Sequence, residues 1–140
     1  MTKVVINRCW GGFGISNDAL LELIFMKSDA IETIPMTKYS GPDWLERTRK
    51  EYSVSFKAGF TKHEYLEGVL VKDDIVYHFD DDHGELRSHP DLVKVVEDMG
   101  GKKASASLAN LIIVKIPQGV KFKIDDYDGM EKVCETHREW

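Results

Sequence analysis

The residues best placed to do chemistry lie around a glycine-rich segment near the start of the chain. Gly11, Gly12 and Gly14 follow a short β-branched run that is typical of a buried strand. Ser16 then stands where a helix N-cap is expected, ahead of a strongly apolar segment. Backbone N–H groups in such a turn, together with the helix dipole, favour a negative charge. The order strand, glycine turn and helix therefore predicts a site for a small anionic group, with Arg8 beside it.

The same segment also has a structural interpretation. It contains neither GxGxxG nor the Lys-Ser/Thr ending of a Walker loop, so a purely structural turn is the alternative to a phosphate site. Cys9 is a candidate nucleophile, although a thiol at a strand end is more often a small core residue. No residue is assigned a catalytic role. The predicted ligand-binding set draws on both ends of the chain: Asn7, Arg8, Cys9, Gly11, Gly12, Phe13, Gly14, Ser16, Tyr127, Glu131, His137 and Arg138.

A second polar cluster follows a strand candidate at Ile75–Phe79. His78 and His83 flank three consecutive aspartates at 80–82, and Glu85 comes just after them. Carboxylates and imidazoles at this density are able to hold a divalent cation. However, the spacing matches neither a calcium-binding loop nor a helical HxxxH pair. A solvated acidic loop is favoured, and neither a metal nor a cofactor is expected.

The elements that must position these groups follow an α+β pattern, with period-2 segments beside helix-period segments. Strands are predicted at Val4–Asn7, Ile31–Met36, Val54–Phe60, Tyr65–Val71, Ile75–Phe79, Leu111–Ile116 and Val120–Ile124. Helices are predicted at 17–27, 43–52, 90–99, 102–109 and 128–137. We expect a single domain over residues 1–140, with a mainly antiparallel sheet and packed helices. That sheet is expected to contain Val4–Asn7, Ile75–Phe79, Leu111–Ile116 and Val120–Ile124, the last two as antiparallel partners.

The predicted last helix rests on the spacing of Asp128 and Glu131, which is that of a capping box. Glu131 and His137 also form a candidate acid and base pair, against the simpler interpretation of a capping glutamate and a surface histidine. If the two ends of the chain meet across one sheet, then Arg8, the glycine turn and this last helix line one cleft.

Composition excludes several classes of protein. The 140 residues carry a net charge of −5 with lysines and arginines scattered, which argues against a nucleic-acid binder. The two cysteines form no metal pattern, and a reduced intracellular state is the default. No apolar run reaches about 18 residues, and no signal-peptide pattern is present. We therefore expect a cytoplasmic protein without a membrane span. Helix 17–27 lacks a wide polar face, which predicts self-association as a homodimer.

The two ends of the sequence carry distinctive stretches, KVVINRCWGGFGIS at the start and IPQGVKFKIDDYDGMEKVCETHREW at the end. These stretches resemble a family of small, mostly uncharacterised proteins of bacteriophages and prophage regions, and SHPDLVKVVEDMGGKKASASLANLIIVKIP fits that family less tightly. Residues 28–80 look like a family-specific insertion. The resemblance implies a phage accessory role in the host cytoplasm and adds little chemistry.

Three functions stay open at this stage. The first is a module that binds a small anionic, nucleotide-like ligand at the glycine turn. The second is an interaction protein that binds a host protein, for instance to inhibit a defence system. The third is a small hydrolase or transferase that uses Cys9 or the His/Asp cluster. No complete triad or metal motif supports the third, so an enzyme is the less favoured class.

Overall fold

The computed structural model describes residues 1–35, 38, 53–55, 59–63, 66–79 and 84–135. It has an α+β fold with antiparallel strands, which confirms the predicted fold class. The elements are β1 Thr2–Asn7, α1 Asn17–Phe25, β2 Ile31–Pro35, β3 Ser53–Ser55, β4 Thr61–His63, β5 Leu66–Lys72, β6 Ile75–Phe79, the 3-10 helix η3 Glu85–Ser88, α3 Pro90–Met99, α4 Gly101–Ala104, β7 Leu111–Ile116, β8 Phe122–Tyr127 and β9 Met130–Glu135.

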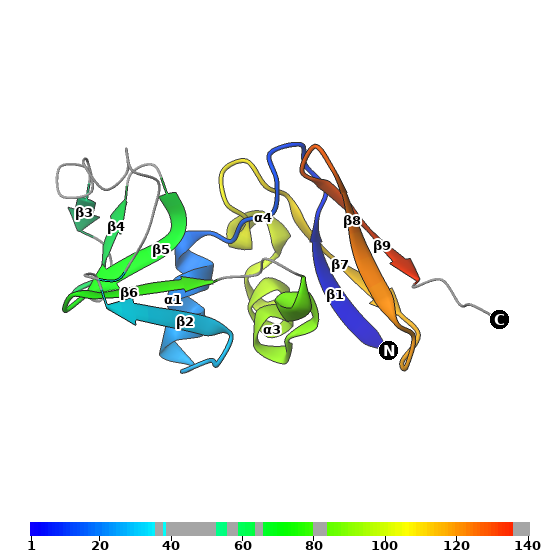
Figure 1. Cartoon of the computed structure of the whole chain (residues 1–140), viewed down its shortest axis with the longest axis horizontal. Helices are drawn as coiled ribbons and strands as arrows, with labels where there is room; N and C mark the ends of the chain where they lie inside the picture. Colours follow the sequence, from blue (N-terminus) through cyan, green and yellow to red (C-terminus); the bar gives the residue numbers. More distant parts are fainter. Residues whose placement is uncertain (36–37, 39–52, 56–58, 64–65, 80–83, 136–140) are drawn as a thin grey trace.

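The described strands form three antiparallel groups. One is a five-stranded sheet in the order β2-β6-β5-β4-β3, and the other two are the pairs β1-β7 and β8-β9. Figure 1 shows the helices between the five-stranded sheet and the β1-β7 pair, with the β8-β9 hairpin on the far side of that pair. Strand β1 therefore lies beside elements from the last third of the sequence, since it pairs with β7 and its Asn7 N–H donates to Glu131 of β9.

Helix α1 is central because most of its apolar residues are buried within its own chain. Its N-cap is Ser16, whose side chain accepts a hydrogen bond from Ala19 N at 3.1 Å, as predicted. Leu20 and Leu23 are fully buried in the main core, which also includes Leu70 of β5 and Leu92 of α3. This packing accounts for the missing polar face except at the end of the helix, where Phe25 stays exposed. The homodimer stays a prediction.

Strand β1 is buried on both faces. Val5 belongs to the core that contains α1 and α3. Val4 and Ile6 are also fully buried, and strand alternation puts them on the opposite face, toward the β8-β9 hairpin. A continuous β-branched run is the pattern expected for a strand covered on both sides.

Two sequence predictions about the last part of the chain are wrong. β7 pairs with β1, in the register Thr2↔Ile116, and not with the strand that follows it. The expected sheet is accordingly divided, since Ile75–Phe79 lies in the five-stranded sheet and Phe122–Tyr127 pairs with β9. The reason is long-range pairing, which local periodicity does not encode.

The predicted last helix is also wrong, because Met130–Glu135 is strand β9. Asp128 and Gly129 have φ values of 51° and 89°, so both adopt the left-handed region between the two strands. Asp-Gly is the usual sequence of such a two-residue hairpin turn. The capping-box spacing therefore competed with a stronger hairpin signal at the same residues.

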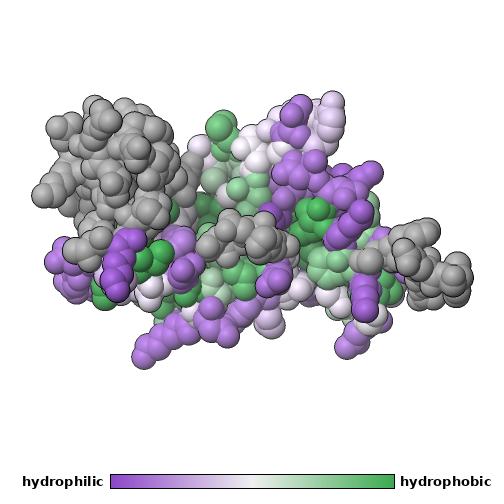
Figure 2. All heavy atoms as spheres, viewed as in Figure 1, coloured by the Kyte–Doolittle hydropathy of each residue, from purple (hydrophilic) through white to green (hydrophobic). Residues whose placement is uncertain are grey.

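Other predictions are confirmed in part. The helix predicted at 102–109 is reduced to α4, Gly101–Ala104. The helix predicted at 43–52 and the acidic stretch 80–83 lie outside the described residues, as do residues 56–58 of the strand predicted at Val54–Phe60. Among the described residues, no helix is long and apolar enough to cross a membrane. Figure 2 shows hydrophilic residues interspersed with hydrophobic ones across the described part of this face.

Candidate functional site

The end of the glycine loop (residues 8–16) is fixed by α4 and by the residues that follow it. Ser16 N donates to Ala104 O at 2.8 Å, and Ala106 N donates to Gly14 O at 3.0 Å. The side chain of Ser16 also donates to Lys103 O at 2.8 Å. The start of α1 is therefore already covered by protein groups, which favours a structural role for the loop backbone over an anion site there.

Two close backbone contacts explain a glycine in this loop, Gly11, and a glycine in the hairpin turn, Gly129. A Cβ on Gly11 would overlap the carbonyl of Leu108, and a Cβ on Gly129 would overlap Gly12 N and Trp10 O. The turn of the β8-β9 hairpin thus lies directly against the glycine loop. These glycines are required for close packing of backbone on backbone.

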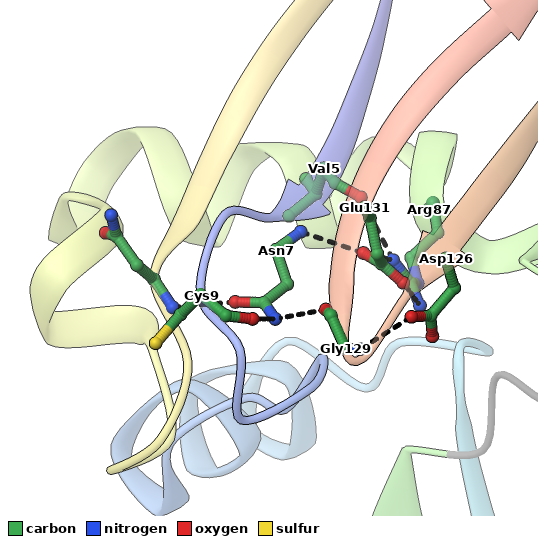
Figure 3. Close-up of polar contacts among 8 residues, drawn as sticks. Val5, Asn7, Cys9, Arg87, Asp126, Gly129 and Glu131 are labelled. Atoms are coloured by element: carbon green, nitrogen blue, oxygen red, sulfur yellow. Dashed lines mark hydrogen bonds and ion pairs between the residues drawn. The ribbon is translucent and has the colours of Figure 1, made fainter.

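Asn7 joins the glycine loop to the hairpin turn. Its buried side chain donates to Cys9 O and Gly129 O, both at 2.7 Å, and accepts from Asn110 N at 2.8 Å. Its backbone N–H donates to the Glu131 carboxylate at 2.8 Å. Figure 3 shows these bonds converging at the end of β1. Asn7 therefore links the glycine loop, through Cys9 O, to the turn of the hairpin, through Gly129 O.

A buried ion pair lies beside Asn7. Arg87 of η3 donates to both carboxylate oxygens of Glu131, at 2.6 and 2.9 Å, and the two side chains are only 7% and 5% exposed. The Arg87 guanidinium lies over the Phe13 ring, with 3.4 Å between Cζ and the ring centre. This two-point pair is the strong, geometrically specific kind. Phe13 and Glu131, both predicted ligand residues, thus contact Arg87.

A pocket of about 250 Å³ opens on the outer side of this network. We call it the hairpin pocket, and its lining residues are Arg8, Asp125, Asp126, Tyr127, Met130, Glu131 and Lys132. Arg8, Tyr127 and Glu131 all belong to the predicted ligand-binding set, and the structure brings these three together in this pocket. They come from the glycine loop and a hairpin, not from a last helix. His137 and Arg138 lie outside the described residues.

Two aromatic side chains lie at this end of the molecule. Trp10 and Tyr127 meet edge to face, with 6.0 Å between ring centres and an angle of 69°. They stay 59% and 73% exposed, respectively. The contact orders both rings and leaves aromatic surface open beside the pocket.

Asp125 and Cys134 form a polar pair across the β8-β9 hairpin. The Cys134 thiol donates to Asp125 Oδ2 at 3.1 Å. This hydrogen bond lowers the pKa of the Asp125 carboxyl and raises the pKa of the Cys134 thiol. Cys134 is therefore held as a thiol, which is the opposite of what a nucleophilic cysteine requires.

A cluster of Asp29, His89 and Asp91 has the composition of a metal site. His89 caps α3, because its Nδ1 accepts from Asp91 N at 3.1 Å, and its Nε2 lies 2.7 Å from Asp29 Oδ1. Nδ1 therefore carries no proton, and Nε2–H donates to the carboxylate. A metal-bound imidazole usually carries its proton on the nitrogen away from the metal. The geometry thus favours a helix cap over a metal centre.

The residues that the sequence did not point to are Arg87 and the pocket residues Asp125, Asp126, Met130 and Lys132. Arg87 lies in a short 3-10 segment without periodicity. The four hairpin residues had a signal, the Asp128–Gly129 turn, which places them on paired strands.

In comparisons with known proteins, no family model matches this chain, and no curated protein or solved structure is significantly similar to it. The resemblance to small phage proteins therefore stays a prediction.

Proposed function

We propose that this protein is a binding module for a small anionic, nucleotide-like ligand, held in the hairpin pocket. The observation that carries the proposal is the convergence of Arg8, from the glycine loop, with Tyr127 and Lys132, from the hairpin, around one cavity of about 250 Å³. This is the sequence-based hypothesis moved from the turn backbone to the side chains beside it.

The cations of the pocket are available to a ligand. Among the described residues, neither Arg8 nor Lys132 takes part in an ion pair. Arginine offers a planar fork of N–H donors that matches phosphate and carboxylate. Each charge-assisted hydrogen bond to such a group contributes about 1.5–3 kcal/mol. Two cations therefore give a small anion enough affinity for detection at millimolar concentrations.

The pocket is also held in place by the surrounding structure. Arg8 N donates to Asn110 O at 2.9 Å, which fixes the backbone that carries the guanidinium. The hairpin wall is held by the Arg87–Glu131 pair and by the bond from Asn7 Nδ2 to Gly129 O. A preformed site loses less conformational entropy on binding.

A thermal-shift screen of phosphate-bearing compounds tests the proposal. A ligand at a hundred times its Kd stabilises the folded state by about 2.7 kcal/mol, which raises Tm by roughly 5–10 °C for a domain of this size. We expect Arg8→Ala to remove most of this shift. Lys121→Ala is the matched control, since Lys121 is exposed and does not line the pocket. Equal shifts in both variants, or no shift with any compound, would contradict the proposal.

Binding of a host protein is the second candidate, and a groove between α1 and α3 favours it. Phe25 and Met26 are 56% and 37% exposed at the end of α1. They line a groove of about 540 Å³ together with Val95 and Met99, with Glu22, Lys94 and Asp98 at its polar positions. Exposed apolar residues in a groove are typical of an interaction site. Sedimentation of the parent and Phe25→Lys proteins would show whether the groove instead joins two copies.

A further inference from the structure

Opposite charges lie side by side in the hairpin pocket. Arg8 and Lys132 are its cations, and Asp125 and Asp126 are its remaining anions, since Glu131 is occupied by Arg87. Asp125 Oδ1 lies 3.8 Å from Nζ of the exposed Lys123, a loose ion pair outside the pocket lining. Among the described residues, no ion pair joins either cation to either aspartate. A simple anion would satisfy only the cations. The ligand that complements this pocket must also bring hydrogen-bond donors to the carboxylates.

The carboxylates retain accepting capacity for such donors. Asp126 Oδ1 accepts from Gly129 N at 2.7 Å, and Asp125 Oδ2 accepts from Cys134 Sγ at 3.1 Å. An ionised carboxylate has about four acceptor positions and no donor. Each aspartate therefore has lone pairs left, and these suit N–H groups of a ligand.

The ligand of this pocket also needs a flat ring, in addition to an anionic group and hydrogen-bond donors. Tyr127 lines the pocket, and Trp10 holds its ring edge to face while most of the tyrosine stays exposed. Exposed aromatic rings beside basic groups are the usual platform for stacking a nucleobase. A volume of about 250 Å³ lies just below the usual range of about 300–1,000 Å³ for small-molecule sites. The pocket thus suits one ring system with its anionic group at the mouth, not a large cofactor.

We infer that the hairpin pocket takes a guanine-type nucleotide, with the phosphate at Arg8 and Lys132, the ring on Tyr127 and the N–H edge at the aspartates. Guanine presents two adjacent donors, N1–H and the N2 amine, which match the two oxygens of a carboxylate. Adenine presents one amine beside an acceptor nitrogen, which a carboxylate repels. This inference rests on the proposed function and adds the identity of the base.

Titration calorimetry with four probes tests it: GMP, IMP, AMP and ribose 5-phosphate. IMP lacks the N2 amine, so we expect it to bind about tenfold more weakly than GMP, the loss of one charge-assisted bond. AMP should bind at least tenfold more weakly. Ribose 5-phosphate, which has neither ring nor N–H edge, should bind about a hundredfold more weakly.

Substitutions assign the preference to the pocket. Asp125→Asn and Asp126→Asn each keep a side-chain oxygen for the existing bond but lose the charge. We expect at least one of them to reduce GMP affinity to that of IMP, while Asp98→Asn on α3 changes nothing. Tyr127→Ala should weaken every nucleotide about tenfold or more, and Leu108→Ala, a comparably exposed control, should not.

The outcomes separate this inference from the function beneath it. If GMP, IMP, AMP and ribose 5-phosphate bind equally, or if both aspartate variants keep the preference for GMP, the guanine assignment is overturned and the anion-binding function stands. If none of the four binds with a Kd below about 1 mM, a value equivalent to roughly −4 kcal/mol, both are overturned.

Discussion

The middle of strand β1 and its end are held by different physics. On one face, Val5 packs into an apolar core with Leu20, Leu23 and Leu92. At the end of the strand, Asn7, Arg87 and Glu131 form a buried polar network with the hairpin. The apolar core gathers whatever is hydrophobic and of suitable size, while the polar network accepts only one arrangement of donors and acceptors. The pocket is built beside this polar end of the strand.

The polar network positions the hairpin more than it stabilises the fold. A buried ion pair costs desolvation, and a well-packed apolar replacement is often as stable. Removing one partner is different, because it leaves a buried charge without compensation. We therefore expect single changes in this network to be severe and a paired, neutral replacement to be mild.

The largest expected effect is that of Glu131→Ala. It leaves the Arg87 guanidinium buried without its carboxylate and Asn7 N without its acceptor, so we expect a loss of about 3–5 kcal/mol in the free energy of unfolding. Urea denaturation measures it. The double variant Arg87→Met, Glu131→Gln keeps an acceptor for Asn7 N and removes both charges, and it should recover most of the loss. A double variant as unstable as Glu131→Ala would contradict this account of the network.

The next effect is in the apolar core. Leu20 is fully buried, and Leu20→Ala should lower the free energy of unfolding by about 2–5 kcal/mol through lost burial and a residual cavity. Because Leu20 is not part of the hairpin pocket, nucleotide affinity measured at low temperature should be unchanged. A parallel loss of nucleotide affinity would mean that the apolar core and the hairpin pocket are more strongly coupled than their contacts indicate.

A smaller effect is expected where the hairpin turn meets the glycine loop. Gly129→Ala strains a backbone with φ of 89° and places a Cβ against Gly12 N. Gly119→Ala is the matched control, since Gly119 has φ of 84° with open space around it. Backbone strain should lower the free energy of unfolding of both variants by about 1–3 kcal/mol. Gly129→Ala should be the less stable of the two in thermal unfolding, and it should also weaken ligand binding. Equal losses would show that the close contact is relaxed in solution.

The smallest effect concerns Cys134. Its raised pKa means that less thiolate is present at a given pH, so alkylation at pH 8 should be slower than for a free thiol. Asp125→Asn should speed it up. Because the pKa of Cys134 is raised in the folded state, this thiol contributes to folding stability below the ordinary thiol pKa. That contribution is lost as the pH rises through the raised pKa. The lowered pKa of Asp125 contributes above the ordinary carboxyl pKa and is lost as the pH falls through the lowered value. Fast alkylation of Cys134 in the parent protein would contradict the hydrogen bond between Cys134 and Asp125.

Local signals predicted the elements well where one element dominates its own sequence. The N-cap at Ser16, the helix after Pro90 and the strand Leu111–Ile116 all match the structure. Which strands pair with one another was harder to predict from the sequence. β7 is bound by β1, more than a hundred residues away in the chain, and nothing in the periodicity of either strand names the other.

The site was half predictable for a related reason. Arg8 and Tyr127 stood out by residue type and by their place in the two terminal motifs, and the structure brings both to one pocket. Arg87 could not be found this way, because its role depends on burial against Phe13 and Glu131. Lys132 faces Asp125 across the hairpin, which becomes visible only once Asp128–Gly129 is recognised as a turn.

Two-dimensional ¹H–¹⁵N spectra of the labelled protein, titrated with GMP, test the central claim most directly, because they compare the two candidate surfaces in one experiment. We expect saturable shifts at the amides of Arg8, Tyr127 and Lys132 around the hairpin pocket, and no change at Phe25 and Met99 in the groove between α1 and α3. Shifts confined to the groove, or none at any concentration up to about 1 mM, the weak limit for a specific site, would contradict it.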